Sequence, residues 1–324
     1  MEVSLHNTAW HQEEALALEN EALRSVVVPK MGGKLVSLFD KRNQIEWLVG
    51  PDQRSFRPVP YGASFVDQDM SGWDEMFPTI VACSYPGPGE NQGVELPDHG
   101  EVWTLPWSVE GNPTDHISLA VEGQALPYRL SRRMGFSATD TIEFYYQLIN
   151  TGRVPIPYIW ASHPQFSCGQ GVEIELPPQV RQVCNTLPEE WGWSKPETVY
   201  DWPDALDPSG ERVRLDQVGP ADLKQARKFF IPPTVQIDRV RLIRKDSRDW
   251  LRMIWSPEDV PYFGIWIDEG ALSHASVVTP EPMTGYYDSL ETAWKKNRVS
   301  IAEPGNVYSW RMTVQLGVEE GPQI

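Results

Sequence analysis

The sequence has few cysteines and lacks any long hydrophobic run. Its three cysteines, Cys83, Cys168 and Cys184, are widely spaced and form no CxxC motif. We therefore expect neither a disulfide framework nor a metal site, and a reducing compartment is favoured. No segment approaches the roughly 20 apolar residues of a membrane helix, and the N-terminal segment lacks the basic and apolar regions of a signal peptide. These absences predict a cytoplasmic protein with no membrane partner.

Basic residues are also scarce. The 324 residues include 28 Lys and Arg against 45 Asp and Glu, which gives a formal net charge of −17. Nucleic acids attract proteins through basic surfaces, so no nucleic-acid partner is expected. The sequence also lacks the glycine-rich GxxxxGK and GxGxxG motifs that bind nucleotide phosphates. We therefore predict that the protein uses no cofactor.

Proline, by contrast, is abundant, with 29 residues in the chain. Because proline breaks helix interiors, long helices should be rare. Apolar residues instead alternate with polar ones, which predicts strands with one buried face. Two such strands carry Ile142, Phe144, Tyr146 and Leu148, and Trp310, Met312, Val314 and Leu316. Segments 23–28, 34–39 and 45–49, separated by turns at 31–33 and 40–43, predict a β-meander.

Only two segments favour helices. One covers residues 221–230, and the other begins at Asp288, whose carboxylate is expected to cap the first turn together with Glu291. We predict an all-β fold, a large antiparallel β-sandwich with few short helices, formed by a single domain over residues 1–324. The first 20 or so residues are expected to be peripheral, and the Pro- and Trp-rich stretch 187–208 is a candidate insertion.

Two of the six histidines have settings that suit chemistry. His163 lies in the segment Trp160-Ala161-Ser162-His163-Pro164, and the following proline biases it toward extended backbone. Such a histidine at a strand end suits proton transfer near neutral pH, although a structural histidine bonded to the backbone is an equal alternative. His99 lies in the segment Asp98-His99-Gly100. The others, His6, His11, His116 and His274, are expected to be surface or structural residues.

Glu281 is the carboxylate with the most distinctive setting. It follows the apolar segment 277–279 and lies between Pro280 and Pro282, which restrict its backbone. Apolar neighbours would raise its pKa toward that of a useful base. Glu303, in a similar Pro-Gly context, is interpreted as part of a turn. Asp238 interrupts a β-branched segment and either faces a pocket or pairs with a neighbouring arginine.

Tryptophan is the other enriched residue, with 14 in the chain. Trp73 stands directly before Asp74 and Glu75. A flat ring beside carboxylates suits a sugar, whose C–H groups pack on the ring while its hydroxyls bind the acids. For any single tryptophan, filling the core between two sheets is the favoured alternative.

The order of these segments resembles the aldose 1-epimerase (galactose mutarotase-like) family. The segments that carry the resemblance are Gly32–Leu35, Asp98–Gly100, Trp160–Pro164, Ile237–Val240, Pro280–Pro282 and Pro304–Trp310. It covers nearly the whole chain, and it implies a large β-sandwich of the galactose mutarotase-like supersandwich type. The implied ligand is a small-molecule sugar.

The resemblance also implies a role for each site residue. His163 would protonate the ring oxygen of the sugar, and Glu281 would remove the proton of the anomeric hydroxyl. His99 would bind and polarise the sugar. Asp238 corresponds to a substrate-contacting aspartate of the hexose-6-phosphate branch, and Trp73 and Asp74 fall in the first sugar-contacting region.

Two departures from the family pattern concern the substrate. Trp103 stands where the phosphohexose branch has an arginine, and the segment 73–75 carries acids where arginine or proline is common. Because carboxylates repel phosphate, we predict a non-phosphorylated sugar. Two alternatives remain open: a non-catalytic carbohydrate-binding or sugar-sensing protein, and a glycoside-cleaving enzyme in which Asp74 or Asp238 partners Glu281. The sequence predicts no particular oligomeric state.

Overall fold

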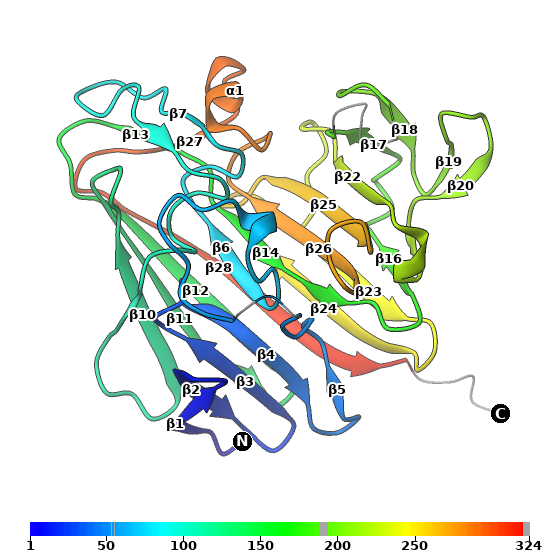
Figure 1. Ribbon diagram of the computed structural model, residues 1–324, viewed down its shortest axis with the longest axis horizontal. Helices are drawn as coiled ribbons and strands as arrows, with labels where there is room; N and C mark the ends of the chain where they lie inside the picture. The colour runs from blue at the N-terminus through cyan, green and yellow to red at the C-terminus, as the bar shows by residue number, and fades with distance from the viewer. Residues whose placement is uncertain (53, 55, 188–193, 320–324) are drawn as a thin grey trace.

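Two large antiparallel sheets, stacked face to face, form most of the molecule (Figure 1). The computed structural model describes residues 1–52, 54, 56–187 and 194–319. The all-β sandwich expected from the sequence is thus confirmed. No described helix combines the length and the apolar character that a membrane span requires.

The larger sheet carries the N-terminal meander at one edge and the central strands of the site in its middle. Its strand order is β1 (Ser4–Trp10), β2 (Glu13–Glu19), β3 (Leu23–Val28), β4 (Lys34–Asp40), β6 (Trp73–Met76), β14 (Ala161–Pro164), β26 (Ser276–Met283), β25 (Tyr262–Glu269), β22 (Ala226–Phe230), β17 (Gln182–Asn185) and β18 (Val199–Asp201). Two short strands join it off this path, β5 (Ile45–Glu46) beside β4 and β15 (Phe166–Ser167) beside β26.

The smaller sheet is built on long central strands. Its order is β21 (Gln217–Val218), β16 (Val172–Glu175), β23 (Arg239–Arg244), β24 (Asp249–Trp255), β28 (Val307–Val318), β12 (Thr141–Asn150), β11 (Tyr128–Ala138), β10 (His116–Glu122) and β9 (Ser108–Val109). Three further strand pairs complete the described β-structure: β13 (Ile156–Tyr158) with β27 (Ser300–Ala302), β19 (Asp204–Leu206) with β20 (Arg212–Arg214), and β7 (Cys83–Ser84) with β8 (Glu95–Leu96).

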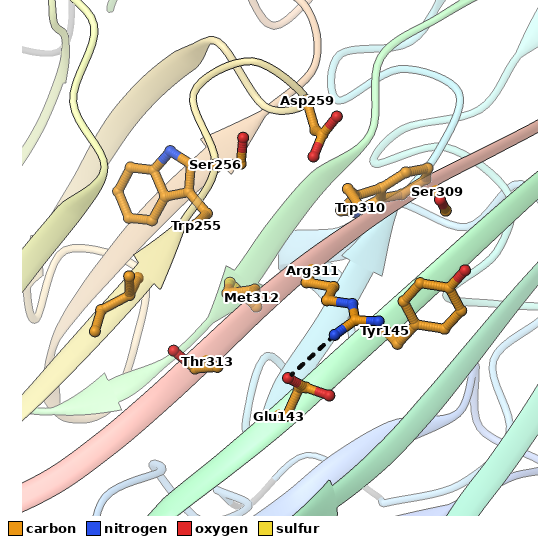
Figure 2. A pocket seen from close by; sticks show the side chains of 11 residues that line it. Glu143, Tyr145, Trp255, Ser256, Asp259, Ser309, Trp310, Arg311, Met312 and Thr313 are labelled. Carbon is orange, nitrogen blue, oxygen red and sulfur yellow. Dashed lines mark ion pairs between the residues drawn. The ribbon is translucent and has the colours of Figure 1, made fainter. Parts of the chain in front are cut away.

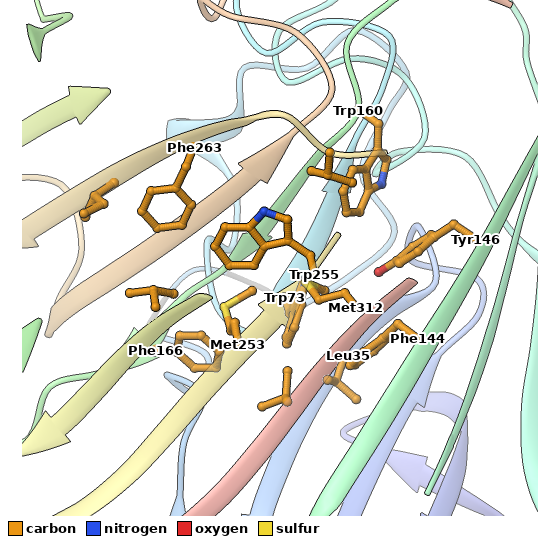
Figure 3. Packing of buried hydrophobic residues seen from close by; sticks show 14 of the residues in the cluster. Leu35, Trp73, Phe144, Tyr146, Trp160, Phe166, Met253, Trp255, Phe263 and Met312 are labelled. Atoms are coloured by element: carbon orange, nitrogen blue, oxygen red, sulfur yellow. The ribbon is translucent and has the colours of Figure 1, made fainter. Parts of the chain in front are cut away.

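The core lies between the two sheets and is rich in aromatic side chains (Figure 3). On β12, Phe144 and Tyr146 are fully buried, and on β28, Trp310 and Met312 are buried opposite them. The period-two patterns therefore predicted the inward faces of both strands. Each such side chain contributes about 1.5–3 kcal/mol by leaving water.

The predicted meander is confirmed, with β3, β4 and β5 at the expected places. The first 20 residues form β1 and β2, the outermost strands of the larger sheet. Within the candidate insertion, residues 188–193 lie outside the described part of the chain, and β18 adds the last strand at the opposite edge of the same sheet.

The helix predicted over residues 221–230 is wrong. A 3₁₀ turn, η3, covers only Ala221–Leu223, and Lys224 then adopts a left-handed conformation with φ 54°. The rest is strand β22, which pairs with β25 along its whole length. Helix-forming residues in this segment are overridden by sheet pairing, because strand preference depends mainly on tertiary context.

The second helix exists, but its N-cap lies one residue later than predicted. The helix α1 covers Leu290–Lys295, and its cap is Ser289, whose side chain accepts a hydrogen bond from the backbone of Thr292. Asp288 does not serve as the cap because its carboxylate binds Lys228 instead. A further 3₁₀ turn, η1, covers Phe65–Asp67.

Candidate active site

A pocket of about 240 Å³ opens on the face of the larger sheet that points away from the core. On β25, Ile265 and Ile267 pack in the core, so the intervening Trp266 points to the opposite face, as strand alternation requires. The polar lining residues are His99, His163, Gln165, Lys228, Trp266, Asp268, Glu281 and Asp288. The apolar lining residues are Phe65, Val66, Met70, Ile80, Val81, Leu187 and Leu272.

Three strands of the larger sheet, β14, β26 and β22, bring the reactive side chains together. In the register of the sheet, Ala161 of β14 lies opposite Met283 of β26, which places His163 and Glu281 on the same face of adjacent strands. Lys228 comes from β22, one strand beyond β25. Neighbouring strands are roughly 4.8 Å apart, so the long side chain of Lys228 reaches Glu281 across the intervening β25.

His163 and Glu281 form the centre of the site. Nε2 of His163 lies 3.6 Å from Oε1 of Glu281, and both side chains are buried. Opposite Glu281 in the register stands Gly264, where a Cβ would lie 3.3 Å from Oε2 of Glu281. The missing side chain of Gly264 therefore leaves room for the carboxylate.

The surroundings shift both groups toward their uncharged forms. Burial raises the pKa of Glu281 to about 7 against the opposing charge of Lys228, and Asp288 adds to the rise. Burial, with the charges of His99 and Lys228, holds the pKa of His163 well below its usual 6.5. Below about pH 7 the pair therefore holds one proton, which lies mainly on Glu281, while His163 is uncharged.

His99 forms the wall of the pocket next to this pair. Its Nδ1 lies 2.8 Å from Oδ1 of Asp98, so this nitrogen donates and Nε2 is the ring atom left for a ligand. The ring stacks on Phe65 at 4.1 Å between centroids and meets the edge of His163 at 5.3 Å. After it, Gly100 has φ 71°, and a Cβ there would lie 2.2 Å from the carbonyl oxygen of Phe77.

The structure does not place Trp73 in the pocket, so its prediction as a sugar-binding residue is wrong. The side chain is fully buried between the sheets, with its ring 4.9 Å from that of Phe144 and 5.7 Å from that of Phe166. The reason is strand parity, because Trp73 and Glu75 point into the core from β6 while Asp74 points to the opposite face. The favoured alternative, a core tryptophan, is correct.

Asp74 is also buried, and it does not line the pocket. Its Oδ2 lies 3.1 Å from Nζ of Lys34. Burial raises its pKa to about 6, although Lys34 opposes this rise. Glu75 is compensated in the core by Arg132 at 2.9 Å. Neither acid is free to repel a phosphate, so this argument against a phosphorylated sugar does not hold.

Asp238 lies outside the site, and its predicted role in substrate binding is wrong. Its half-exposed carboxylate pairs with Arg239 at 2.8 Å, just before β23 of the smaller sheet. The core separates that sheet from the pocket. A neighbouring arginine as its partner was the alternative that the sequence had left open.

Sequence reasoning missed Lys228 and Asp288. Nζ of Lys228 lies 2.8 Å from Oε2 of Glu281 and 2.8 Å from Oδ1 of Asp288. Lys228 was hidden in a segment interpreted as a helix, and Asp288 was interpreted as a helix cap. Interpreting Ala226, Lys228 and Phe230 as one face of a strand would have indicated a buried lysine.

A second hollow lies on the smaller sheet, between β12, β24 and β28 (Figure 2). Its volume is about 420 Å³. Arg311 there lies 3.9 Å from Glu143 and 5.2 Å from the centre of the Tyr145 ring. The described residues that line it include no histidine and none of the predicted site residues, so it offers less for acid–base chemistry than the pocket of Glu281.

The cysteines and the acidic residues show no metal-binding arrangement in the part of the chain that is described. No three His, Cys, Asp or Glu side chains among the described residues gather as ligands of one ion. The three cysteines are free thiols.

Comparison with known proteins identifies the fold. No protein-family model and no curated protein matches the sequence. Among solved structures, Slr1438 from Synechocystis sp. PCC 6803 has a TM-score of 0.73 and 16% sequence identity, covering 97% of this chain and 100% of its own. A galactose mutarotase related enzyme from Lactobacillus acidophilus has a TM-score of 0.65 and 14% identity, with 94% and 100% coverage. A candidate aldose 1-epimerase from Escherichia coli K12 has a TM-score of 0.64 and 14% identity, with 98% and 100% coverage. The chain therefore has the galactose mutarotase-like fold.

Proposed function

We propose that the protein is an aldose 1-epimerase-like mutarotase that interconverts the anomers of a sugar by acid–base ring opening. The observation that carries this proposal is the pair of His163 and Glu281, 3.6 Å apart and buried in one pocket. The fold supports it, because solved structures with the same architecture include a galactose mutarotase related enzyme and a candidate aldose 1-epimerase.

The reaction needs two proton transfers on one pyranose. Glu281 takes the proton of the anomeric hydroxyl while His163 gives one to the ring oxygen, and the bond from C1 to the ring oxygen breaks to leave an open-chain aldehyde. Rotation about C1–C2 and the reverse transfers close the ring on either face. Each positioned transfer contributes typically 10²–10⁴-fold in rate, and the scheme requires no cofactor.

The reactive form carries the same number of protons as the resting pair. At rest the shared proton favours Glu281, since burial raises the pKa of Glu281 and lowers that of His163. In the reactive form this proton is on His163 and the carboxylate is free to act as a base. The hydroxyls of a bound sugar can stabilise that form by hydrogen bonding to the carboxylate.

We further propose that the sugar is not phosphorylated. Among the described residues that line the pocket, Lys228 is the one Lys or Arg, and it is paired with Glu281 and Asp288. Asp268 adds a third carboxylate to the lining. A phosphate group would therefore enter a pocket with an excess of acids and no free guanidinium.

The free thiols of all three cysteines support a cytoplasmic location.

The test is exchange between anomers, measured by magnetisation transfer in NMR with a panel of neutral aldoses. We expect the wild-type protein to accelerate exchange of at least one sugar, and Glu281→Gln and His163→Asn each to lower that rate at least 100-fold. Glu303→Gln and His274→Asn serve as matched controls, because both side chains are exposed, and they should keep the wild-type rate.

Wild-type rates in both site variants would contradict the assignment of the pair. Binding of a sugar by calorimetry without any anomer exchange would favour the carbohydrate-binding alternative. Release of the leaving group from chromogenic glycosides would favour hydrolysis.

A further inference from the structure

We propose that Lys228 and Asp288 are positioning residues that act together on Glu281: Lys228 favours its ionised carboxylate, and Asp288, which contacts the same ammonium, opposes that effect. The biological meaning of this inference rests on the proposed function, since a reversible epimerase must accept and return a proton at the same carboxylate. The physical claim concerns Glu281 alone.

The geometry shows one cation divided between two carboxylates. Nζ of Lys228 lies 2.8 Å from Oε2 and 3.2 Å from Oε1 of Glu281, so it contacts both carboxylate oxygens. The same nitrogen lies 2.8 Å from Oδ1 of Asp288. The lysine side chain is 8% exposed and that of Asp288 18%, so solvent screens these contacts only weakly.

The two partners act on Glu281 in opposite directions. Burial alone would keep this fully buried carboxyl in its neutral form. Lys228 by itself would hold it as a permanent ion pair. Because Asp288 repels the charge on Glu281 and also engages Lys228, it offsets part of that stabilisation. The balance leaves the proton on Glu281 removable near neutral pH.

Other charged and titratable groups line the same pocket or lie close to it. His163 approaches Glu281 from β14. His99 and its partner Asp98 lie in the loop after β8, and Asp268 comes from β25. Lys34 and Asp74 form an ion pair on β4 and β6. None of these side chains is substituted in the Lys228 and Asp288 variants, so a changed titration of Glu281 is assigned to the substituted residue.

The same arrangement prevents a side reaction. An open-chain aldehyde forms an imine only with an unprotonated amine. Although burial opposes it, the charges of Asp288 and Glu281 raise the pKa of Lys228 above its usual value. Lys228 therefore stays protonated and does not trap the aldehyde that ring opening would release.

The experiment is a pH titration of the Glu281 carboxyl by ¹³C NMR, in protein labelled at the glutamate side-chain carboxyl and without any sugar. The signal is assigned by its loss in Glu281→Gln. We expect Lys228→Met to raise the titration midpoint by at least about one pH unit, and Asp288→Asn to lower it by a similar amount, since a neighbouring charge shifts a pKa by about 1–3 units. Lys228→Arg should stay closest to wild type among the site variants.

The matched control is Lys30→Met, which removes a surface lysine paired with Glu14 at 3.2 Å and should leave the midpoint unchanged. Shifts of both site variants in the same direction, or of neither, would overturn the proposal. If Lys228→Met does not fold, Asp288→Asn decides alone, because Asp288 is partly exposed. The titration needs no turnover, so a wild-type protein that lacks anomer exchange would refute the proposed function and leave this result intact.

Discussion

The sequence indicated which residues form the centre of the site but not how they are protonated. The Pro-Glu-Pro and His-Pro segments indicated Glu281 and His163, and the structure brings them together with His99. Their protonation could not be predicted, because it depends on burial and on Lys228, a residue 53 positions away from Glu281 in the chain. Trp73 was misplaced because a motif does not reveal which face of a strand a side chain occupies, and Asp238 because a motif does not reveal which sheet a segment joins.

The shared proton makes the rate depend on pH in a defined way. The active pair holds one proton, so the rate should fall as pH rises through about 7 and that proton is lost. It should also fall on the acid side, where His163 takes up a second proton below its usual range. We therefore expect a bell-shaped profile of kcat/KM from anomer exchange. A rate that keeps rising well above neutral pH would contradict it.

At the scale of the elements, strand β25 must leave space for the carboxylate of β26. An added methyl group in Gly264→Ala would lie 2.6 Å from the Phe230 ring and 3.3 Å from Oε2 of Glu281. We expect a cost of about 1–3 kcal/mol in the free energy of unfolding from overpacking, measured by urea denaturation. The exchange rate should fall at least tenfold in the folded protein.

The control for this change is Gly50→Ala, where a Cβ meets nothing within 4 Å. It should alter neither stability nor rate. An unchanged exchange rate in Gly264→Ala would show that the position of Glu281 does not depend on the space opposite it.

Elements with a strong period-two pattern were predictable, and β12 and β28 have the inward faces expected from the sequence. The segment 221–230 was not, because its local helix preference is weaker than the hydrogen bonds of β22 to β25. Sequence patterns also do not reveal that β6, β14, β26 and β25 become neighbours. That order arises from long-range pairing, and it creates the pocket.

At the scale of the whole molecule, a buried polar network joins the two sheets. Glu75 of β6 accepts hydrogen bonds from Arg132 of β11 at 2.9 Å, from Tyr146 of β12 at 2.8 Å and from Nε1 of Trp160 at 2.9 Å. Both charged side chains are almost completely buried. The network thus satisfies a carboxylate that the core would otherwise exclude.

Removing one charge of this pair should destabilise the sandwich. We expect Arg132→Met to lower the free energy of unfolding by about 3–5 kcal/mol, because Glu75 is left buried and uncompensated. Arg311→Met, which removes an exposed arginine near Glu143, should change it by no more than about 1 kcal/mol. Urea unfolding of both variants measures the difference, and equal effects would contradict a structural role for the network.

The central claim is that one pyranose bridges His163 and Glu281, and a crystal structure of the Glu281→Gln variant with a neutral aldose tests it most directly. The account predicts the sugar in the pocket of His99 and Lys228, with its anomeric oxygen within hydrogen-bond distance of residue 281 and its ring oxygen within reach of His163. A sugar bound instead in the hollow beside Tyr145 and Arg311, or in the pocket with neither oxygen near these two side chains, would contradict it.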